Sequence, residues 1–199
     1  MSTLRTAGLI SSGRGRRSIV LNNSRTESFE ASISATQWIR SQGYTPGQIT
    51  RWVGRMPAPE QIAAGLGIDP GEQIVSYVRV RCADDRPVLI ERGNFRTDPG
   101  HHVLAFDTDS GSIHHHLAQQ GVDFNSISRA LDAVGATEED AELLGVEPGA
   151  PLQAMTLRAV DSAGVPIEYS RYVYRADLLR MGMNIVRGYP SPLWVELSI

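Results

Sequence analysis

The apolar and polar positions of this chain form a pattern that occurs twice. Each copy begins with an acidic, Ala-rich stretch typical of a helix, followed by Leu-Gly-[Ile/Val]-[Asp/Glu]-Pro-Gly. An apolar run, a polar turn and a second apolar run ending in aromatic residues come next. The hexapeptide starts at Leu66 and again at Leu144, a spacing of 144 − 66 = 78. A helix and a hairpin, repeated once, predict two equivalent units that pair around a pseudo-two-fold axis in one sheet.

The same pattern assigns the elements of an α+β fold. The two units are expected to form helices near 59–64 and 138–142 and strands at 74–81, 87–95, 152–160 and 165–174. The rest of the chain is expected to form helices at 31–42 and 112–120, strands at 49–56 and 124–134, a turn at 98–102, and a closing strand after 178.

Composition describes an ordinary globular chain with one unusual bias. With 199 residues, 41% of them hydrophobic, the chain can bury one core with room for a small appendage. No apolar run approaches the roughly 18 residues that span a bilayer. The single cysteine, Cys82, excludes an internal disulfide, fits a reducing cytoplasm and is expected to be buried. All 19 basic residues are Arg, whose planar guanidinium suits carboxylates and phosphates.

Positive charge gathers at the start of a chain whose net charge is -3. Five arginines precede the first acidic residue, Glu27: Arg5, Arg14, Arg16, Arg17 and Arg25. Such asymmetry predicts a nucleic-acid contact at the N-terminus. Residues 4–10 are typical of a helix end, 11–17 of a Gly/Arg turn and 18–21 of a strand, an order that fits the wing of a winged helix. A disordered basic tail is the alternative.

The ordered motifs between residues 112 and 177 resemble a known family. Leu143-Leu144-Gly145-Val146, Pro148-Gly149-Ala150-Pro151, Asp161 to Tyr169 and Tyr174-Arg175-Ala176-Asp177 resemble the UTRA effector-binding domain of the HutC subfamily of GntR regulators. The resemblance covers about residues 28–188. It implies a chorismate-lyase-like antiparallel sheet with packed helices and a small-molecule pocket between the halves. It also implies a homodimer whose affinity for DNA is set by a ligand.

The resemblance also divides the chain. It implies the end of a recognition helix and a wing in residues 1–21, a linker in 22–30 and the effector-binding domain in 31–199. Arg14, Arg16 and Arg17 at the wing tip would then contact DNA. Because the family places several helices before the wing, Met1 is expected to lie inside a longer protein. A natural short form that antagonises a full-length paralogue is the alternative.

Candidate ligand contacts begin with two arginines on one strand. Arg79 and Arg81 are two residues apart, so both point to one face and could clamp a carboxylate or phosphate. Two surface arginines are the alternative. The resemblance implies that this pair contacts an anionic effector, and adds further contacts at Glu91, Ser112, His114, Arg129, Glu168 and Tyr174. Ser112 could instead be only a helix cap, Glu168 a partner of Arg158 or Arg175, and Tyr174 a core residue.

The sequence contains little that indicates metal binding or catalysis. His114, His115 and His116 lie about 100° apart around a helix, so they cannot chelate one ion together and are expected to form a solvated face. No nucleophile, phosphate-loop or zinc motif is present. The sequence therefore predicts a regulator, a repressor released by a small anionic metabolite, without cofactor or metal. A lyase-like enzyme on the same fold is the second hypothesis.

Overall fold

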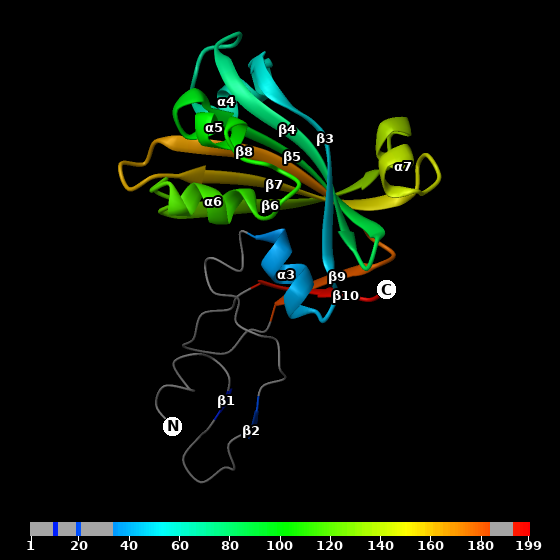
Figure 1. Cartoon of the computed structure of the whole chain (residues 1–199). Coiled ribbons are helices and arrows are strands. Elements are labelled where there is room, and N and C mark those ends of the chain that lie inside the picture. Colours follow the sequence, from blue (N-terminus) through cyan, green and yellow to red (C-terminus); the bar gives the residue numbers. More distant parts are fainter. Residues whose placement is uncertain (1–9, 12–18, 21–33, 184–192) are drawn as a thin grey trace.

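A computed structural model describes residues 10–11, 19–20, 34–183 and 193–199. Its centre is a six-stranded antiparallel sheet (Figure 1). The strands, in their order across the sheet, are β3 (Pro46–Pro57), β4 (Gln73–Ala83), β5 (Arg86–Arg96), β8 (Pro166–Arg175), β7 (Pro151–Val160) and β6 (Ser126–Gly135). The α+β class and the antiparallel sheet predicted from the sequence are confirmed.

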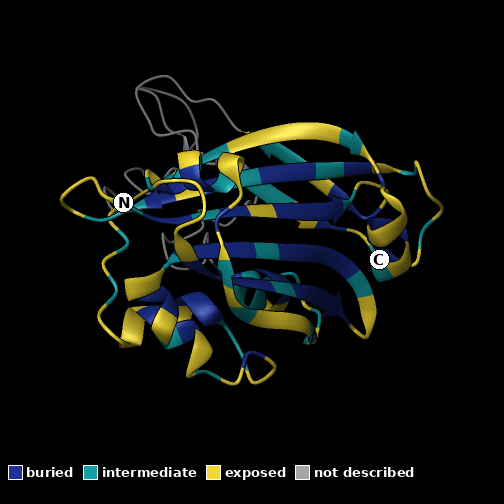
Figure 2. Ribbon diagram, turned by 90° about the horizontal axis from the view of Figure 1, so that it is seen from above, coloured by how far each residue is buried: buried dark blue, intermediate teal, exposed yellow. Residues whose placement is uncertain are grey.

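In the described part of the chain, five helices cover the two faces of the sheet. They are α3 (Ala35–Ser41), α4 (Glu60–Leu66), α5 (Thr97–Leu104), α6 (Ile113–Gln119) and α7 (Glu138–Leu144). Helices α4 and α7 pack on one face, against Ile74 and Ile90 respectively. The other three pack on the opposite face, called here the Arg79 face, against residues such as Phe95 and Leu89. The central strands are therefore buried on both sides, and the edge strands are more exposed (Figure 2).

The predicted repeat is present and extends further than the sequence pattern indicated. Helices α4 and α7 start 78 residues apart (138 − 60 = 78), and each ends in a left-handed glycine, Gly67 or Gly145. Helices α3 and α6 also start 78 residues apart (113 − 35 = 78). Each half is thus helix, strand, helix, hairpin, and the halves join where β5 pairs with β8. The turn of the second hairpin is one residue longer, so beyond it the spacing becomes 79 (166 − 87 = 79). Arg92 therefore pairs with its own repeat equivalent, Arg171, and the pseudo-axis passes between them.

The turn expected at 98–102 is wrong, because these residues lie inside helix α5. Pro99 occupies the first turn of the helix, where no backbone N–H is needed for an intrahelical bond. Gly100 lets the helix approach the sheet, since a Cβ at this position would lie 2.6 Å from Cβ of Val75. A Pro-Gly pair, usually a turn signal, here permits close helix–sheet packing.

The C-terminal part forms a small sheet of its own rather than joining the main one. Strand β9 (Leu179–Met183) pairs with β10 (Leu193–Leu197), beside helix α3 (Figure 1). The indole N–H of Trp38 donates to the carbonyl of Val195 at 3.2 Å, which ties α3 to this pair. Near the N-terminus, β1 (Ile10–Ser11) pairs with β2 (Ile19–Val20). The remainder of the expected wing, Arg14, Arg16 and Arg17 included, lies outside the described residues.

Candidate functional site

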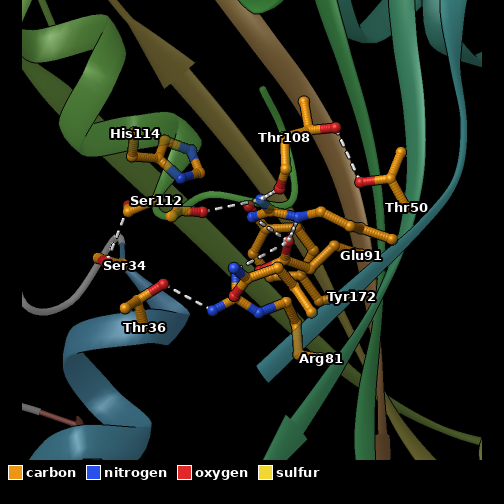
Figure 3. A network of polar contacts seen from close by, with 12 residues as sticks. Ser34, Thr36, Thr50, Arg81, Glu91, Thr108, Ser112, His114 and Tyr172 are labelled. Atoms are coloured by element: carbon orange, nitrogen blue, oxygen red, sulfur yellow. Dashed lines mark hydrogen bonds and ion pairs between the residues drawn. The ribbon is translucent and has the colours of Figure 1, made fainter. Parts of the chain in front are cut away.

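Polar side chains are buried together on the Arg79 face, between the sheet and the starts of α3 and α6 (Figure 3). They are Arg79, Arg81, Glu91, His114, Glu168 and Ser170. Burying charges without partners is costly, so the partners of each group decide what it does. The two arginines differ sharply in this respect.

Arg79 uses its donors within the protein. Its Nε and Nη2 donate to Oε2 of Glu91 at 2.9 and 2.7 Å. Its Nη1 donates to the carbonyls of Thr108 and Gly111 at 2.7 and 3.0 Å. These carbonyls belong to the loop that leads into α6, so Arg79 anchors that loop to the sheet.

Arg81 is fully buried, yet its side chain makes a single hydrogen bond to the described residues. Nη2 donates to Oγ1 of Thr36 at 2.6 Å, and Nη1 lies 4.0 Å from Oε2 of Glu91. Within the described part of the chain, Nε and Nη1 have no hydrogen-bond partner. Burial lowers the pKa of Arg81, against the opposing effect of Glu91. A buried guanidinium with unused donors is a ready site for an anion.

Glu91 lies between the two arginines and balances one positive charge. Burial raises the pKa of Glu91, but the charges of Arg79 and Arg81 outweigh burial and hold it below its ordinary value. The carboxylate therefore stays ionised at neutral pH. It lies closer to Arg79 than to Arg81, which leaves Arg81 as the less compensated cation.

Glu168 has different partners from those considered in the sequence. Its Oε1 accepts from Oγ of Ser170 at 2.6 Å, and its Oε2 lies 2.8 Å from Nε2 of His114. The alternative partners are engaged elsewhere: Arg158 donates to the carbonyl of Gly65 and Arg175 to Asp177. The structural pairing of Glu168 with either arginine is wrong.

His114 is buried, so the expectation that all three histidines form a solvated face fails at this position. Its ring lies edge-on to Phe124, with centroids 5.6 Å apart. Within the described ranges, no group of three or more His, Cys, Asp or Glu side chains is placed to hold a metal ion.

The starts of α3 and α6 meet above the arginines. Ser34 Oγ donates to Oγ of Ser112 at 2.9 Å. Each serine also caps its own helix, Ser34 by accepting from N of Gln37 and Ser112 by accepting from N of His115. The two residues are repeat equivalents (112 − 34 = 78). The predicted cap at Ser112 is confirmed, and the hydroxyl has a second partner across the pseudo-axis.

Two candidate residues lie in other surroundings. Tyr174 packs edge-on against Trp38 in the hydrophobic core, with ring centroids 6.1 Å apart. Arg129 lies on the edge strand β6, opposite Leu157. Tyr172, which the sequence reasoning missed, lies opposite Glu91 on the Arg79 face. Burial and Glu168 raise its pKa well above the ordinary value. Alternation from Glu168 through Ser170 to Tyr172 could have identified it.

The chain is thus an α+β domain of two repeat-related halves with a buried, incompletely hydrogen-bonded arginine between them. The UTRA domain, as a family, matches residues 41–180. The chain belongs to the UTRA domain family.

Known relatives are transcriptional regulators. The chain is 26% identical over 177 residues to the HTH-type transcriptional repressor NagR of Bacillus subtilis, covering 89% of this chain and 73% of NagR. It is 27% identical over 146 residues to the HTH-type transcriptional repressor PhnF of Mycolicibacterium smegmatis, covering 72% of this chain and 59% of that protein.

Solved structures agree on the fold. The effector domain of PhnF from Mycobacterium smegmatis matches with a TM-score of 0.65 and 22% identity, covering 76% of this chain and 90% of that one. The C-terminal domain of Yurk from Bacillus subtilis matches with a TM-score of 0.60 and 26% identity, covering 64% and 88%. The chorismate-lyase-like architecture expected from the resemblance is therefore confirmed. Among the described helices, none is long and apolar enough to cross a membrane.

Proposed function

We propose that the chain is the ligand-sensing part of a GntR-type repressor of the HutC subfamily that works in the cytoplasm as a homodimer. A small anionic metabolite is its effector. DNA is contacted through an N-terminal winged-helix domain to which Arg14, Arg16 and Arg17 belong. The observation that carries the sensing role is Arg81, a buried cation whose Nε and Nη1 have no hydrogen-bond partner among the described residues.

The geometry favours one carboxylate or phosphate group per chain. Arg81 offers unused donors, whereas Arg79 is bound to Glu91 and to the loop before α6. The repeat equivalent of Arg81 is Ala159 (159 − 81 = 78), so the second half offers no matching cation. The hydroxyl of Tyr172 and the carboxylates of Glu91 and Glu168 would contact polar groups on the rest of the effector.

Helix α3 connects this site to the N-terminal region. Thr36 accepts from Arg81, and Ser34 donates to Ser112, both within the first turn after residues 22–33. An anion that takes up donors of Arg81 competes with Thr36 and changes how firmly the start of α3 is held. The effector thereby shifts the population of α3 positions and, through the connecting segment, the arrangement of the DNA-binding domains.

Native mass spectrometry tests the proposal directly. The chain is expected to appear as a dimer that retains one small anion per subunit when incubated with inorganic phosphate, a hexose phosphate or a dicarboxylate. A stoichiometry of one follows from the single Arg81 site. Two anions per subunit, or none from any of these probes, would contradict it.

Thr36→Val is expected to uncouple α3 from the site while leaving anion binding within about tenfold of wild type, the worth of one typical hydrogen bond. In wild type, a bound anion should increase amide exchange at the start of α3, measured by hydrogen–deuterium exchange. In the variant this response should disappear, because Arg81 no longer holds the helix.

Thr50→Val is the matched control. The hydroxyl of Thr50 also makes a partly buried hydrogen bond, with Oγ1 of Thr108 at 2.8 Å, but it does not bond to Arg81. Thr50→Val should therefore keep the anion-induced increase in amide exchange at the start of α3. If Thr36→Val keeps the response as well, coupling through this hydrogen bond is wrong.

A further inference from the structure

The two edges of the main sheet differ in how they are protected. An edge strand exposes unpaired N–H and C=O groups that can pair with another chain, and proteins block such edges with prolines, bulges and charges. Strand β3 has all three. It begins and ends with proline, its pairing with β4 is interrupted between Thr50 and Trp52, and Arg51 and Arg55 are exposed.

Strand β6 lacks the prolines and the break in register, and its two charges are of opposite sign. It pairs with β7 over ten residues, from Ser126 to Gly135, without a break in register and without a proline. Four successive residues, 130–133, are exposed, and three of them are apolar. Leu131 is 41% exposed. The strand carries one positive and one negative charge, Arg129 and Asp132, so it does not repel a copy of itself as β3 would.

The hydrogen-bonding pattern fixes which groups of β6 are available. Just beyond the strand, N of Ala136 donates to the carbonyl of Ala150 at 2.8 Å. Alternation along an antiparallel pair then directs the even-numbered residues of β6 towards β7 and the odd-numbered residues outward. Residues 127, 129, 131, 133 and 135 therefore point N–H and C=O groups away from the sheet.

We propose that β6 is the surface on which a second copy of this chain docks, by antiparallel pairing of β6 with the partner's β6. A two-fold axis perpendicular to the sheet requires residues of equal parity to face each other, because side chains alternate between the faces. Pairing centred on Leu131 brings all five outward residues into hydrogen-bonded pairs. Two six-stranded sheets then form one sheet of twelve strands. This inference rests on the proposed homodimer and specifies its surface.

Side-chain contacts favour β6 over β3 for this role. In the pairing centred on Leu131, the two leucines face each other and Ala133 faces Arg129, so no like charges are directly opposed. The corresponding pairing of β3, centred on Val53, would place Arg51 opposite Arg55, and directly opposed like charges destabilise a sheet. A copy of the same chain therefore fits β6 and not β3.

Leu131→Arg, with Val53→Arg as the matched control on β3, tests the surface by light scattering over a concentration series. Leu131→Arg should raise the dimer dissociation constant about 100-fold, because an apolar contact at the axis becomes a pair of like charges. Val53→Arg should leave it unchanged. A dimer that survives Leu131→Arg, or one that Val53→Arg dissociates, would overturn β6 as the interface.

Cysteine crosslinking gives an independent readout. Residues directly opposed in a hydrogen-bonded pair lie about 5.5 Å apart at Cα, within reach of a disulfide. Leu131→Cys should therefore form a covalent dimer on mild oxidation, whereas Val53→Cys should not. The native Cys82 is buried and gives no background. A monomeric wild type would overturn the dimer itself, and binding of phosphate to Leu131→Arg would show separately whether anion sensing stands.

Discussion

Arg81→Met is expected to abolish binding of the proposed anionic effector with only a small loss of stability of the domain. Removing a buried charged partner from an ion contact costs about 2–5 kcal/mol, a loss of at least about 30-fold in affinity. The fold should lose less stability than in Arg79→Ala, because Arg81 gives up one hydrogen bond, to Thr36, and a longer contact of 4.0 Å with Glu91, and Met fills a similar volume. Glu91 keeps its closer partner, Arg79, at 2.7 Å, so its charge is not left uncompensated. Thermal unfolding with and without phosphate measures both effects.

Arg51→Met provides the comparison for Arg81→Met. Arg51 is an exposed arginine on β3, so its replacement removes the same charge without touching the buried cluster. It should keep the anion-induced rise in melting temperature. The binding role of Arg81 is refuted if Arg81→Met keeps this rise, and the minor weight of Arg81 in the stability of the fold is refuted if the variant unfolds at a much lower temperature than wild type.

Arg79→Ala should have the opposite profile, a large loss of stability. Breaking a buried ion pair by removing one partner typically costs about 3–5 kcal/mol, because the remaining charge is left uncompensated. Here Glu91 would lose its nearest partner, and the carbonyls of Thr108 and Gly111 would lose their donor. Urea unfolding followed by circular dichroism should show the lower free energy of unfolding.

The surface pair of Arg175 and Asp177 is the control for Arg79→Ala. Its nitrogen and oxygen are 2.6 Å apart, a shorter contact than that of Arg79, but the Asp177 side chain is 56% exposed. Arg175→Ala should therefore cost no more than about 1 kcal/mol. If the two variants are equally stable, burial does not set the importance of the Arg79 pair.

Local sequence signals predicted the elements that depend on local chemistry. The repeated hexapeptide located both left-handed glycines, and Ser112 was identified as a cap. Helix α5 was missed because Pro99 and Gly100 are permitted there by tertiary packing against Val75, which no local pattern records. The repeat relation between α3 and α6 was missed because most residues inside the two helices differ, although both helices share an N-cap Ser and a closing Gln-Gly, Gln42-Gly43 and Gln120-Gly121.

The candidate site was predicted as a set of residues but not as a set of roles. Arg79 and Arg81 are the same residue type on the same face of one strand, so the sequence alone does not distinguish their roles. Their difference comes from groups far away in the chain: Thr108 and Gly111 bind Arg79, and Thr36 binds Arg81. His114 was expected to be solvated because its neighbours are histidines, yet the helix turns it towards Glu168. Such assignments require the tertiary structure.

The contact between Ser34 and Ser112 has a consequence for the symmetry of the two halves. Two equivalent residues that meet across a pseudo-two-fold axis are what an isologous interface between two identical subunits contains. In such an ancestral pair neither serine could be distinguished from the other. Within a single chain, Ser34 follows the segment that leads to the N-terminus, whereas Ser112 follows the loop held by Arg79. Placing the two halves in one chain therefore makes the serines non-equivalent, since Arg81 holds α3 through Thr36 and Arg79 holds the loop before α6.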